Sequence, residues 1–309
     1  MDGVVNVRKT AGPTSHDVVN QVRRIFGQRR VGHAGTLDPM ATGVLVVCLG
    51  KATRIVEYLV GTEKEYHAVI TLGVTTDSQD STGEILTRRD ASGITTEDLR
   101  KATESFVGEI EQVPPMISAI KHEGKPLYKL ARQGKTVERA ARRVTVYSIE
   151  TGDVRLVDRD DEPTRVVADM MVRCSSGTYI RTLCADIGAA LGCGAMMSKL
   201  ERTRVGKFGI DDAVTVDHLL EAQANGRLEE HISSISDALA ELPAVVLDAG
   251  GMRRISHGMP VFAPESIAVG TTVRLTSPDN VTVAVGEAME TDGVRLARPH
   301  KVFLDAEDS

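Results

Sequence analysis

A glycine-punctuated loop that runs straight into an uninterrupted apolar segment is the feature that most constrains the fold of this chain. The loop is GQRRVGHAGTLDPMATG (residues 27–43), and GVLVVCLG follows at residues 43–50. The apolar run is too short for a typical globular helix, so it predicts a buried strand. Glycine permits backbone dihedral angles that other residues resist, and it lets the main chain come close to a ligand. The pattern therefore predicts a ligand-binding loop that feeds directly into a buried strand.

The rest of the chain alternates between strand and helix patterns. Strands are expected at residues 4–9, 43–50, 65–74, 144–150 and 166–180, and helices at 17–26, 95–110, 181–192 and 215–240. Ser15 and Thr96 are the expected N-caps of the first two helices. Two short strand patterns, TTVRLTS and VTVAVGEA, predict a small β domain near the C-terminus. The expected fold class is α/β, in a mixed α+β arrangement around a central mixed sheet.

The composition predicts an almost purely aliphatic core. Hydrophobic residues make up 41% of the 309 positions, but Trp is absent and aromatic residues reach only 3%, so a tyrosine within a polar motif stands out. The four cysteines lie singly, without C-x-x-C spacing, which indicates reduced thiols in a cytosolic protein. The N-terminus lacks a leader pattern, and no window holds eighteen uninterrupted apolar residues. We therefore expect a cytoplasmic protein that enters no membrane.

The charge distribution is more informative than the net charge of −6. Polyphosphate binding favours basic surfaces, so the sum alone argues against nucleic acid as a partner. Residues 121–143, however, contain eight basic and two acidic side chains, a local excess of six positive charges. An isolated charge run is usually a solvated face, and this interpretation stays open beside that of an RNA-binding arm.

Asp38 is the carboxylate that the glycine-punctuated loop presents. It precedes Pro39, which disfavours helix at Asp38 and is typical of a turn just before a new element. Such an aspartate usually forms an Asx-turn or caps a helix, and a functional carboxylate is the alternative. The loop matches neither the phosphate-loop spacing G-x-x-x-x-G-K-[ST] nor the dinucleotide fingerprint G-x-G-x-x-G, so phosphate binding is disfavoured.

GHAGTLDPMATGVL, at residues 32–45, closely resembles the catalytic motif of the TruB family of pseudouridine synthases. Further segments resemble the same family in the same order, and they are Lys9 with GPTSHD (12–17), KEY (64–66), LGVTTDSQDSTG (72–83), QVPPMISAIK (112–121), SSGTYIRTL (175–183) and LERT (200–203). The resemblance spans roughly residues 3–210 and weakens towards the C-terminus. Thr10 is one departure, because the family usually has proline after the lysine.

The resemblance implies catalytic roles for three residues. Asp38 would be the nucleophile. Tyr66 would stack on the uracil and act as a base at C5, although a lone tyrosine on a strand is more often structural. Arg181 would pair with the aspartate, since a planar guanidinium can hold a carboxylate ionised. The alternative for Arg181 is a surface side chain of little energetic importance.

Five further residues are implied at the substrate. Tyr179 matches a base-contacting tyrosine, and Leu200 matches an apolar residue packed against the reacting base. His33 would fill the space that the uridine vacates when it leaves its stack. Thr36 would shape the loop, and Lys64 begins the KEY motif. Each also has a structural interpretation, as a core residue or a local hydrogen-bonding group.

The activity implied by the resemblance is isomerisation of uridine 55 in the T-loop of tRNA, without metal or organic cofactor. The carboxylate would attack C1′ or add to C6 of the base, and both routes stay open. A catalytic domain is expected at residues 1–240, with a thumb-like RNA-binding insertion at about 112–143 and a small PUA-like domain at 243–309.

The implied partner is the T-arm of tRNA, bound by a monomer with no obligate protein partner. A tRNA-binding or tRNA-folding chaperone without catalysis is the alternative function. A zinc deaminase is excluded, because the H-x-E and P-C-x-x-C motifs are missing.

Overall fold

The computed structural model describes residues 1–118, 121–122, 124–127, 130, 137–159 and 162–304. Within these residues, the larger part of the chain is built on a ten-stranded sheet. Its strands are β1 (Gly3–Lys9), β2 (Val31–His33), β3 (Thr42–Leu49), β4 (Lys64–Leu72), β7 (Gly108–Gln112), β10 (Arg142–Thr151), β11 (Arg155–Arg159), β12 (Glu162–Cys174), β13 (Ala195–Val205) and β14 (Phe208–Gly209).

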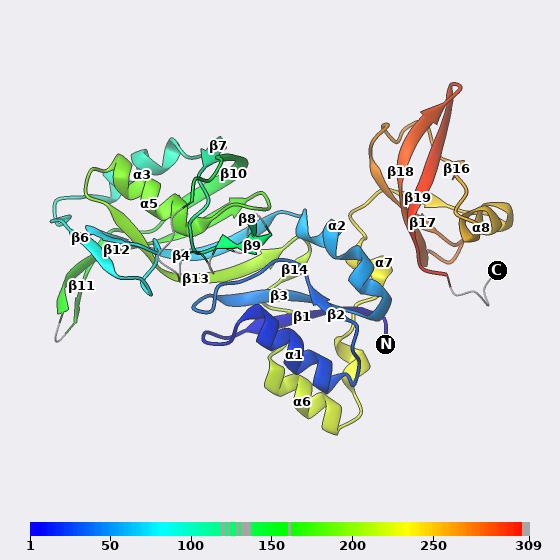
Figure 1. Cartoon of the computed structure of the whole chain (residues 1–309), viewed down its shortest axis with the longest axis horizontal. Coiled ribbons are helices and arrows are strands. Elements are labelled where there is room, and N and C mark those ends of the chain that lie inside the picture. Colours follow the sequence, from blue (N-terminus) through cyan, green and yellow to red (C-terminus); the bar gives the residue numbers. More distant parts are fainter. Residues whose placement is uncertain (119–120, 123, 128–129, 131–136, 160–161, 305–309) are drawn as a thin grey trace.

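The path through this sheet is β1-β3-β13-β4-β12-β10-β7, with β2, β11 and β14 paired at its sides (Figure 1). β3 and β13 run parallel, whereas the other paired strands run antiparallel. The sheet is therefore mixed, which confirms the expected fold class. The sheet places the end of β13 beside both β3 and β4. The family-like motif at residues 32–45 runs into β3, and the motif at residues 64–66 begins β4.

Helices cover the sheet in two groups. They are α1 (Ser15–Ile25), the 3-10 helix η1 (Gly50–Ile55), α2 (Val56–Val60), α3 (Thr96–Glu104), α5 (Ile180–Ala190), α6 (Val216–Ala224), the 3-10 helix η2 (Leu228–His231) and α7 (Ile235–Ala238). Figure 1 shows α1 and α6 side by side near β1 and β3, whereas α3 packs against β10 and α5 packs against β13 and β4. Within the described residues, this part also contains two short hairpins, β5 (Val74–Thr76) with β6 (Ile85–Arg88) and β8 (Lys121–His122) with β9 (Lys125–Pro126).

The apolar run at residues 43–50 forms the buried strand β3, as predicted. Its even-numbered side chains from Val44 to Cys48 pack into the core under η1 and α2. Its odd-numbered side chains from Leu45 to Leu49 pack into the core under α1. Both faces are covered, which explains why the run shows no alternation of apolar and polar residues. The loop that carries Asp38 is thereby anchored on a strand with no solvent-exposed face.

The expected N-caps Ser15 and Thr96 are each wrong by one residue. Thr14 caps α1, because its hydroxyl accepts from the Asp17 amide at 3.1 Å and the Asp17 carboxylate accepts from the Thr14 amide at 2.9 Å. Thr95 caps α3 through the same reciprocal arrangement. A carboxylate at the third helical position decides the cap, since it completes the pair of hydrogen bonds.

Two expected helices are shorter than predicted. The helix expected at 95–110 ends at Glu104, and Gly108, with a φ of 107°, begins β7. The helix expected at 215–240 is interrupted, because Gly226 adopts a φ of 67° and separates α6 from η2 and α7. Glycine takes a positive φ at little cost, and a residue with that conformation ends a helix.

The C-terminal sheet has an apolar core of its own. Its strands are β15 (Ala244–Val246), β16 (Val261–Phe262), β17 (Thr272–Thr276), β18 (Thr282–Thr291) and β19 (Val294–Val302), with helix α8 (Ala249–Ser256) beside them. This part is the expected C-terminal β domain. It docks on the larger part where Lys51 Nζ donates to the Phe303 carbonyl at 3.0 Å and Lys301 pairs with Glu57 at 3.1 Å. None of the described helices is long and apolar enough to cross a membrane.

Candidate active site

The turn that carries Asp38 is tied to its surroundings by two buried side chains. Ser15, at the start of α1, exchanges hydrogen bonds with the backbone of Leu37, at 2.8 and 3.0 Å. Lys9, 1% exposed at the end of β1, donates its ammonium to the carbonyls of Thr10 at 3.0 Å, Pro39 at 3.1 Å and Ala41 at 2.7 Å. The backbone on both sides of the carboxylate is thus held before any substrate arrives.

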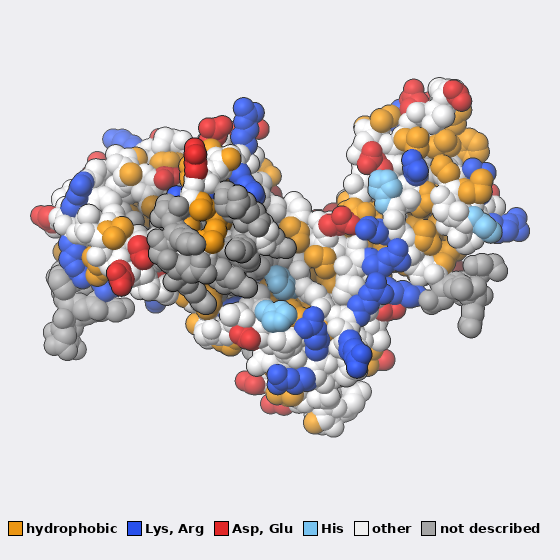
Figure 2. All heavy atoms as spheres, in the orientation of Figure 1, with side chains coloured by type: hydrophobic (Ala, Val, Ile, Leu, Met, Phe, Trp, Pro, Cys, Tyr) orange, Lys and Arg blue, Asp and Glu red, His pale blue; other side chains and the backbone are white. Residues whose placement is uncertain are grey.

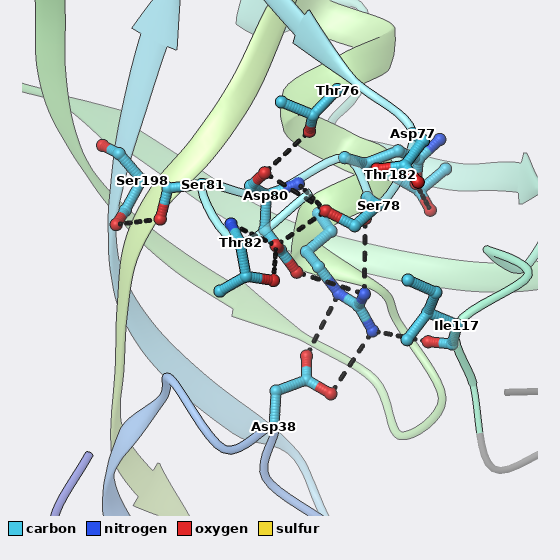
Figure 3. A network of polar contacts seen from close by, with 12 residues as sticks. Asp38, Thr76, Asp77, Ser78, Asp80, Ser81, Thr82, Ile117, Thr182 and Ser198 are labelled. Carbon is cyan, nitrogen blue, oxygen red and sulfur yellow. Dashed lines mark hydrogen bonds and ion pairs between the residues drawn. The ribbon is translucent and has the colours of Figure 1, made fainter. Parts of the chain in front are cut away.

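The guanidinium of Arg181 holds both oxygens of Asp38. Arg181 is 4% exposed on the first turn of α5. Its Nε lies 3.1 Å from Asp38 Oδ2, and its Nη2 donates to Asp38 Oδ1 at 3.3 Å (Figure 3). Nη2 also donates to the carbonyl of Ile117 at 2.8 Å. This is the two-pronged geometry that gives an arginine and a carboxylate a fixed mutual orientation.

A second carboxylate, Asp80, faces the same guanidinium, and the sequence assigned it no role. Its Oδ2 lies 3.2 Å from Arg181 Nη1. Its Oδ1 accepts from the hydroxyl of Ser78 at 2.8 Å and from the amide and hydroxyl of Thr82 at 2.9 and 2.6 Å (Figure 3). Asp80 is 3% exposed, so its negative charge is compensated by hydrogen bonds and by Arg181. Asp80 lies in the segment LGVTTDSQDSTG, whose resemblance to the family was the available signal, although it indicated no role for this residue.

These charges determine how readily Asp38 ionises. Burial raises the pKa of the Asp38 carboxyl above its ordinary value, the positive charge of Arg181 opposes that rise, and the negative charge of Asp80 adds to it. The side chain of Asp38 keeps 33% of its surface exposed, whereas that of Asp80 keeps 4%. Asp38 is therefore the carboxylate of the pair that a substrate can reach. A partly exposed carboxylate held by a guanidinium is suited to act as a nucleophile.

Lys9 makes the stability of this turn depend on pH. Burial lowers the pKa of Lys9 from 10.5 to about 8. Between these values the unfolded chain binds a proton that the folded chain has lost, so the contribution of Lys9 to the free energy of unfolding rises with pH. We expect wild type to gain stability over Lys9→Met between pH 8 and pH 10, as measured by urea denaturation. A constant difference across that window would show that the pKa of Lys9 is unshifted.

Tyr66 and Leu200 lie in the same apolar core as Leu37, next to Asp38 in the sequence. Tyr66 is 8% exposed in β4, where burial raises the pKa of its hydroxyl and the positive charge of Arg202 opposes that rise. Lys64 also lies in β4, but its ammonium donates to the carbonyls of residues 60 and 62 at the end of α2. Burial lowers the pKa of Lys64 to about 8. Lys64 is thus engaged with the protein backbone.

The remaining sequence-predicted residues border the turn from other elements. His33, in β2, is partly buried, and burial lowers the pKa of its imidazole. The carbonyl of Thr36 accepts from Arg202 Nη1 at 3.4 Å. Tyr179 precedes α5, where its amide donates to the Gln112 side chain at 3.0 Å and the Gln112 amide group donates back to its carbonyl at 3.3 Å. Gln112 therefore fixes the backbone next to Arg181, a role that the sequence did not indicate.

A hollow of about 390 Å³ opens elsewhere, on the other face of β4. It is lined by side chains that include His67, Glu150, Asp169 and Thr203. The Asp169 carboxylate is already paired there, with His67 at 2.9 Å and with Arg155. This hollow is therefore not the candidate active site. We place that site at Asp38 and Arg181 because of the chemistry of this pair.

Two family models match this chain. The N-terminal domain of the TruB family of pseudouridylate synthases matches residues 23–180, and the C-terminal domain of tRNA pseudouridylate synthase B matches residues 181–247. The chain belongs to the TruB family. It is therefore an enzyme of the pseudouridine-forming class, and the Asp38 turn is the part of it that carries the family motif.

Relatives of this TruB-family chain match it over nearly their whole length. The tRNA pseudouridine synthase B of Thermobifida fusca is 47% identical over 288 residues, which cover 93% of this chain and 94% of the relative. That of Pelotomaculum thermopropionicum is 46% identical over 294 residues, which cover 93% and 92%. A crystal structure of a Cbf5-Nop10-Gar1 complex contains a chain with a TM-score of 0.74 and 31% identity, covering 99% of this chain and 86% of that one. The TruB fold thus includes the C-terminal sheet.

Proposed function

We propose that this TruB-family enzyme converts uridine 55 in the T-loop of tRNA into pseudouridine, with Asp38 as its nucleophile. The observation that carries the proposal is the partly exposed Asp38 carboxylate, held through both oxygens by the buried guanidinium of Arg181. The names of the relatives support the substrate class, since the relatives of T. fusca and P. thermopropionicum are called tRNA pseudouridine synthase B.

The reaction exchanges one bond at C1′ for another. The N1–C1′ bond breaks, the uracil turns within the pocket, and C5 joins C1′. The proton lost from C5 balances the proton gained at N1, so nothing is consumed. Asp38 acts either by attacking C1′, as in a retaining glycosidase, or by adding to C6 of the base. Tyr66 is the proposed base at C5, and no metal or organic cofactor takes part in this scheme.

Base flipping brings the buried uridine to Asp38. A base inside a folded loop must leave its stack before chemistry, at a cost of a few kcal/mol. We propose that His33, on β2 beside the Asp38 turn, fills the space that the base vacates. Leu200 and Tyr179 would form the walls around the flipped base. The side chain of Lys64 and the carbonyl of Thr36 are bound to other protein groups, so both contribute by shaping the walls.

A basic surface supports RNA as the substrate despite the net charge of −6. Figure 2 shows Lys and Arg side chains gathered over the region of η1 and α2, beside the C-terminal sheet. Arg29 and Arg30 are exposed in the loop before β2, and the Arg30 carbonyl accepts from the Gly50 amide at the start of η1. Proteins grip RNA largely through its phosphates, which such a surface attracts.

We further propose a cytoplasmic monomer that needs no protein partner, with a catalytic unit at residues 1–240 and a PUA-like unit at 243–309. Light scattering of the purified chain, alone and with tRNA, measures the oligomeric state. A chaperone that binds tRNA without catalysis is the alternative, and the paired Asp38 and Arg181 favour catalysis over it. A tRNA-binding assay combined with pseudouridine mapping separates the two functions.

The test of the proposed function is a T-arm hairpin incubated with purified protein and no added metal or nucleotide. Proteins read RNA sequence at splayed bases in loops, so specificity should lie in the shape of the T-arm. We expect pseudouridine at the position of uridine 55 in the hairpin and much slower turnover of a linear oligomer with the same loop sequence. Equal turnover of the two would contradict shape recognition, and an unmodified hairpin would contradict the function itself.

The insertion at residues 112–143 is proposed to bind RNA through phosphates. Of its basic residues, Lys129 and Arg132 lie outside the described residues, whereas Arg142 and Arg143 are exposed at the start of β10. The slope of log K against log salt concentration measures how many phosphates the protein contacts. Replacing Arg142 and Arg143 by Ala should make this slope for tRNA binding shallower by roughly one to two.

A matched control removes two exposed positive charges that lie outside the insertion. Arg100 and Lys101 lie on α3 with 55% and 66% of their side chains exposed, so their replacement by Ala changes the net charge equally. We expect this control to keep the wild-type salt slope. If the two double variants have equal salt slopes for tRNA binding, the basic residues of the insertion form a solvated face and not an RNA-binding surface.

A further inference from the structure

Arg202, in β13, is a fully buried cation that pairs with none of the carboxylates in the described residues. It is among the largest side chains that are fully buried, with 1% of its surface exposed. In the described part of the chain, no carboxylate oxygen lies within ion-pair distance of its guanidinium. An unpaired buried charge is costly unless hydrogen bonds satisfy it. The contacts of Arg202 therefore indicate what the charge is used for.

The guanidinium of Arg202 bonds to the backbone on both sides of Asp38. Its Nη2 donates to the carbonyl of Gly35 at 3.1 Å and its Nη1 to that of Thr36 at 3.4 Å, before the nucleophile in the chain. Its Nε donates to the carbonyl of Val44 at 2.8 Å, after the nucleophile. One rigid planar group therefore spans the entry and the exit of the turn.

Gly43 lets the two segments approach closely enough for these bonds. Arg202 and Gly43 are register partners in the parallel pairing of β13 with β3. A Cβ atom on Gly43 would lie 2.2 Å from the Arg202 carbonyl oxygen, and the φ of Gly43 is 103°. The glycine of the family-like motif thus permits the close approach of the β13 backbone at residue 202.

Arg202 also meets Tyr66, the proposed base. The two residues are register partners in the antiparallel pairing of β13 with β4. The positive charge of Arg202 lowers the pKa of the Tyr66 hydroxyl against the effect of burial. The same charge lowers the pKa of Lys9, His33 and Lys64. Arg202 therefore lies between the nucleophile's turn and the tyrosine.

We propose that Arg202 is a positioning residue of this site: its guanidinium fixes the turn that carries Asp38 relative to Tyr66 on the neighbouring strand. The inference rests on the proposed function and adds a residue to it. Arg202 touches neither Asp38 nor the reacting base in this scheme, so it acts through the backbone and through Tyr66. An ammonium group lacks the planar fork that serves three carbonyls at once, so lysine should replace arginine poorly.

The experiment compares Arg202→Met and Arg202→Lys with wild type, using single-turnover rates on the T-arm hairpin per folded protein. A misplaced nucleophile costs about a hundredfold, so we expect losses of about a hundredfold for Met and about thirtyfold for Lys. Hairpin affinity should stay within about threefold. Tyr66 must be ionised to accept the proton from C5, so the rise in rate that follows its ionisation should move to higher pH in Arg202→Met and stay in place in Arg202→Lys, because only lysine keeps the charge beside Tyr66.

Arg204 supplies the matched control on the same strand. Its side chain is 42% exposed and pairs with Glu65 at 3.3 Å and Glu63 at 3.5 Å. We expect Arg204→Met to keep the wild-type rate per folded protein. Rates within threefold of wild type for both Arg202 variants, with an unmoved pH profile, would overturn the proposal.

A second readout does not depend on activity. Amide hydrogen exchange in the segment 34–44 should accelerate at least about tenfold in both Arg202 variants, because the backbone loses its tether. Exchange in β17 and β18 of the C-terminal sheet should not change. Unchanged exchange at 34–44 would overturn the positioning role even if wild type formed no pseudouridine. A failed hairpin reaction with accelerated exchange would contradict the proposed function alone.

Discussion

Asp38→Asn is expected to abolish pseudouridine formation while tRNA binding survives. An amide cannot supply the carboxylate that both routes require, so the single-turnover rate should fall below detection. The substitution keeps the shape of the side chain, and the turn keeps its bonds from Lys9 and Ser15. Binding should therefore change by less than about tenfold, or about 1.4 kcal/mol.

Three measurements together decide the role of Asp38: hairpin turnover, hairpin affinity and thermal stability of the same preparation. A rate close to that of wild type would mean that another residue is the nucleophile. A parallel loss of binding and stability would mean that Asp38 mainly holds the turn. Asp38→Glu is the useful companion, because it keeps the carboxylate but moves it by one methylene and should retain a trace of activity.

Arg181→Met should have the second largest effect, since it leaves two carboxylates facing each other across an apolar side chain. Asp80 is almost fully buried, and removing the partner of a buried charge costs roughly 3–5 kcal/mol. Losing a preorganised charge from an active site lowers turnover by roughly a hundredfold to a thousandfold. Arg181→Lys should recover part of the stability but little of the rate, because lysine lacks the fork that holds both oxygens of Asp38.

The pH dependence of the rate separates the two carboxylates. The positive charge of Arg181 favours the ionised form of Asp38. Arg181→Met should therefore raise the pKa of Asp38 and move the acid limb of the rate profile to higher pH. Asp80→Asn removes an anion that raises the pKa of Asp38, so it should move the same limb to lower pH. Limbs that move in the same direction, or do not move, would contradict the charge arrangement described here.

The family motif and the buried strand were predictable from the sequence because both are local patterns. The loop at residues 27–43 and the run at 43–50 indicated where Asp38 lies and that β3 is buried on both faces. The resemblance indicated Arg181 and Tyr66. The N-caps and helix ends were predicted less well, since a single reciprocal hydrogen bond or a glycine with positive φ decides them.

Apart from the pairing of Arg181 with Asp38, which the resemblance implied, only the tertiary structure decided which charges meet at the nucleophile. Arg181 lies 143 positions along the chain from Asp38 and 101 positions from Asp80. A local sequence pattern cannot indicate that a helix will bring one arginine between these two distant carboxylates. Arg202 bonds to the carbonyls of Gly35 and Val44, 167 and 158 positions away, through backbone atoms that every residue shares. The resemblance of the sequence motifs therefore identified the reacting groups, whereas strand pairing and helix packing determined most of their electrostatic partners, because both bring together residues that are distant in the chain.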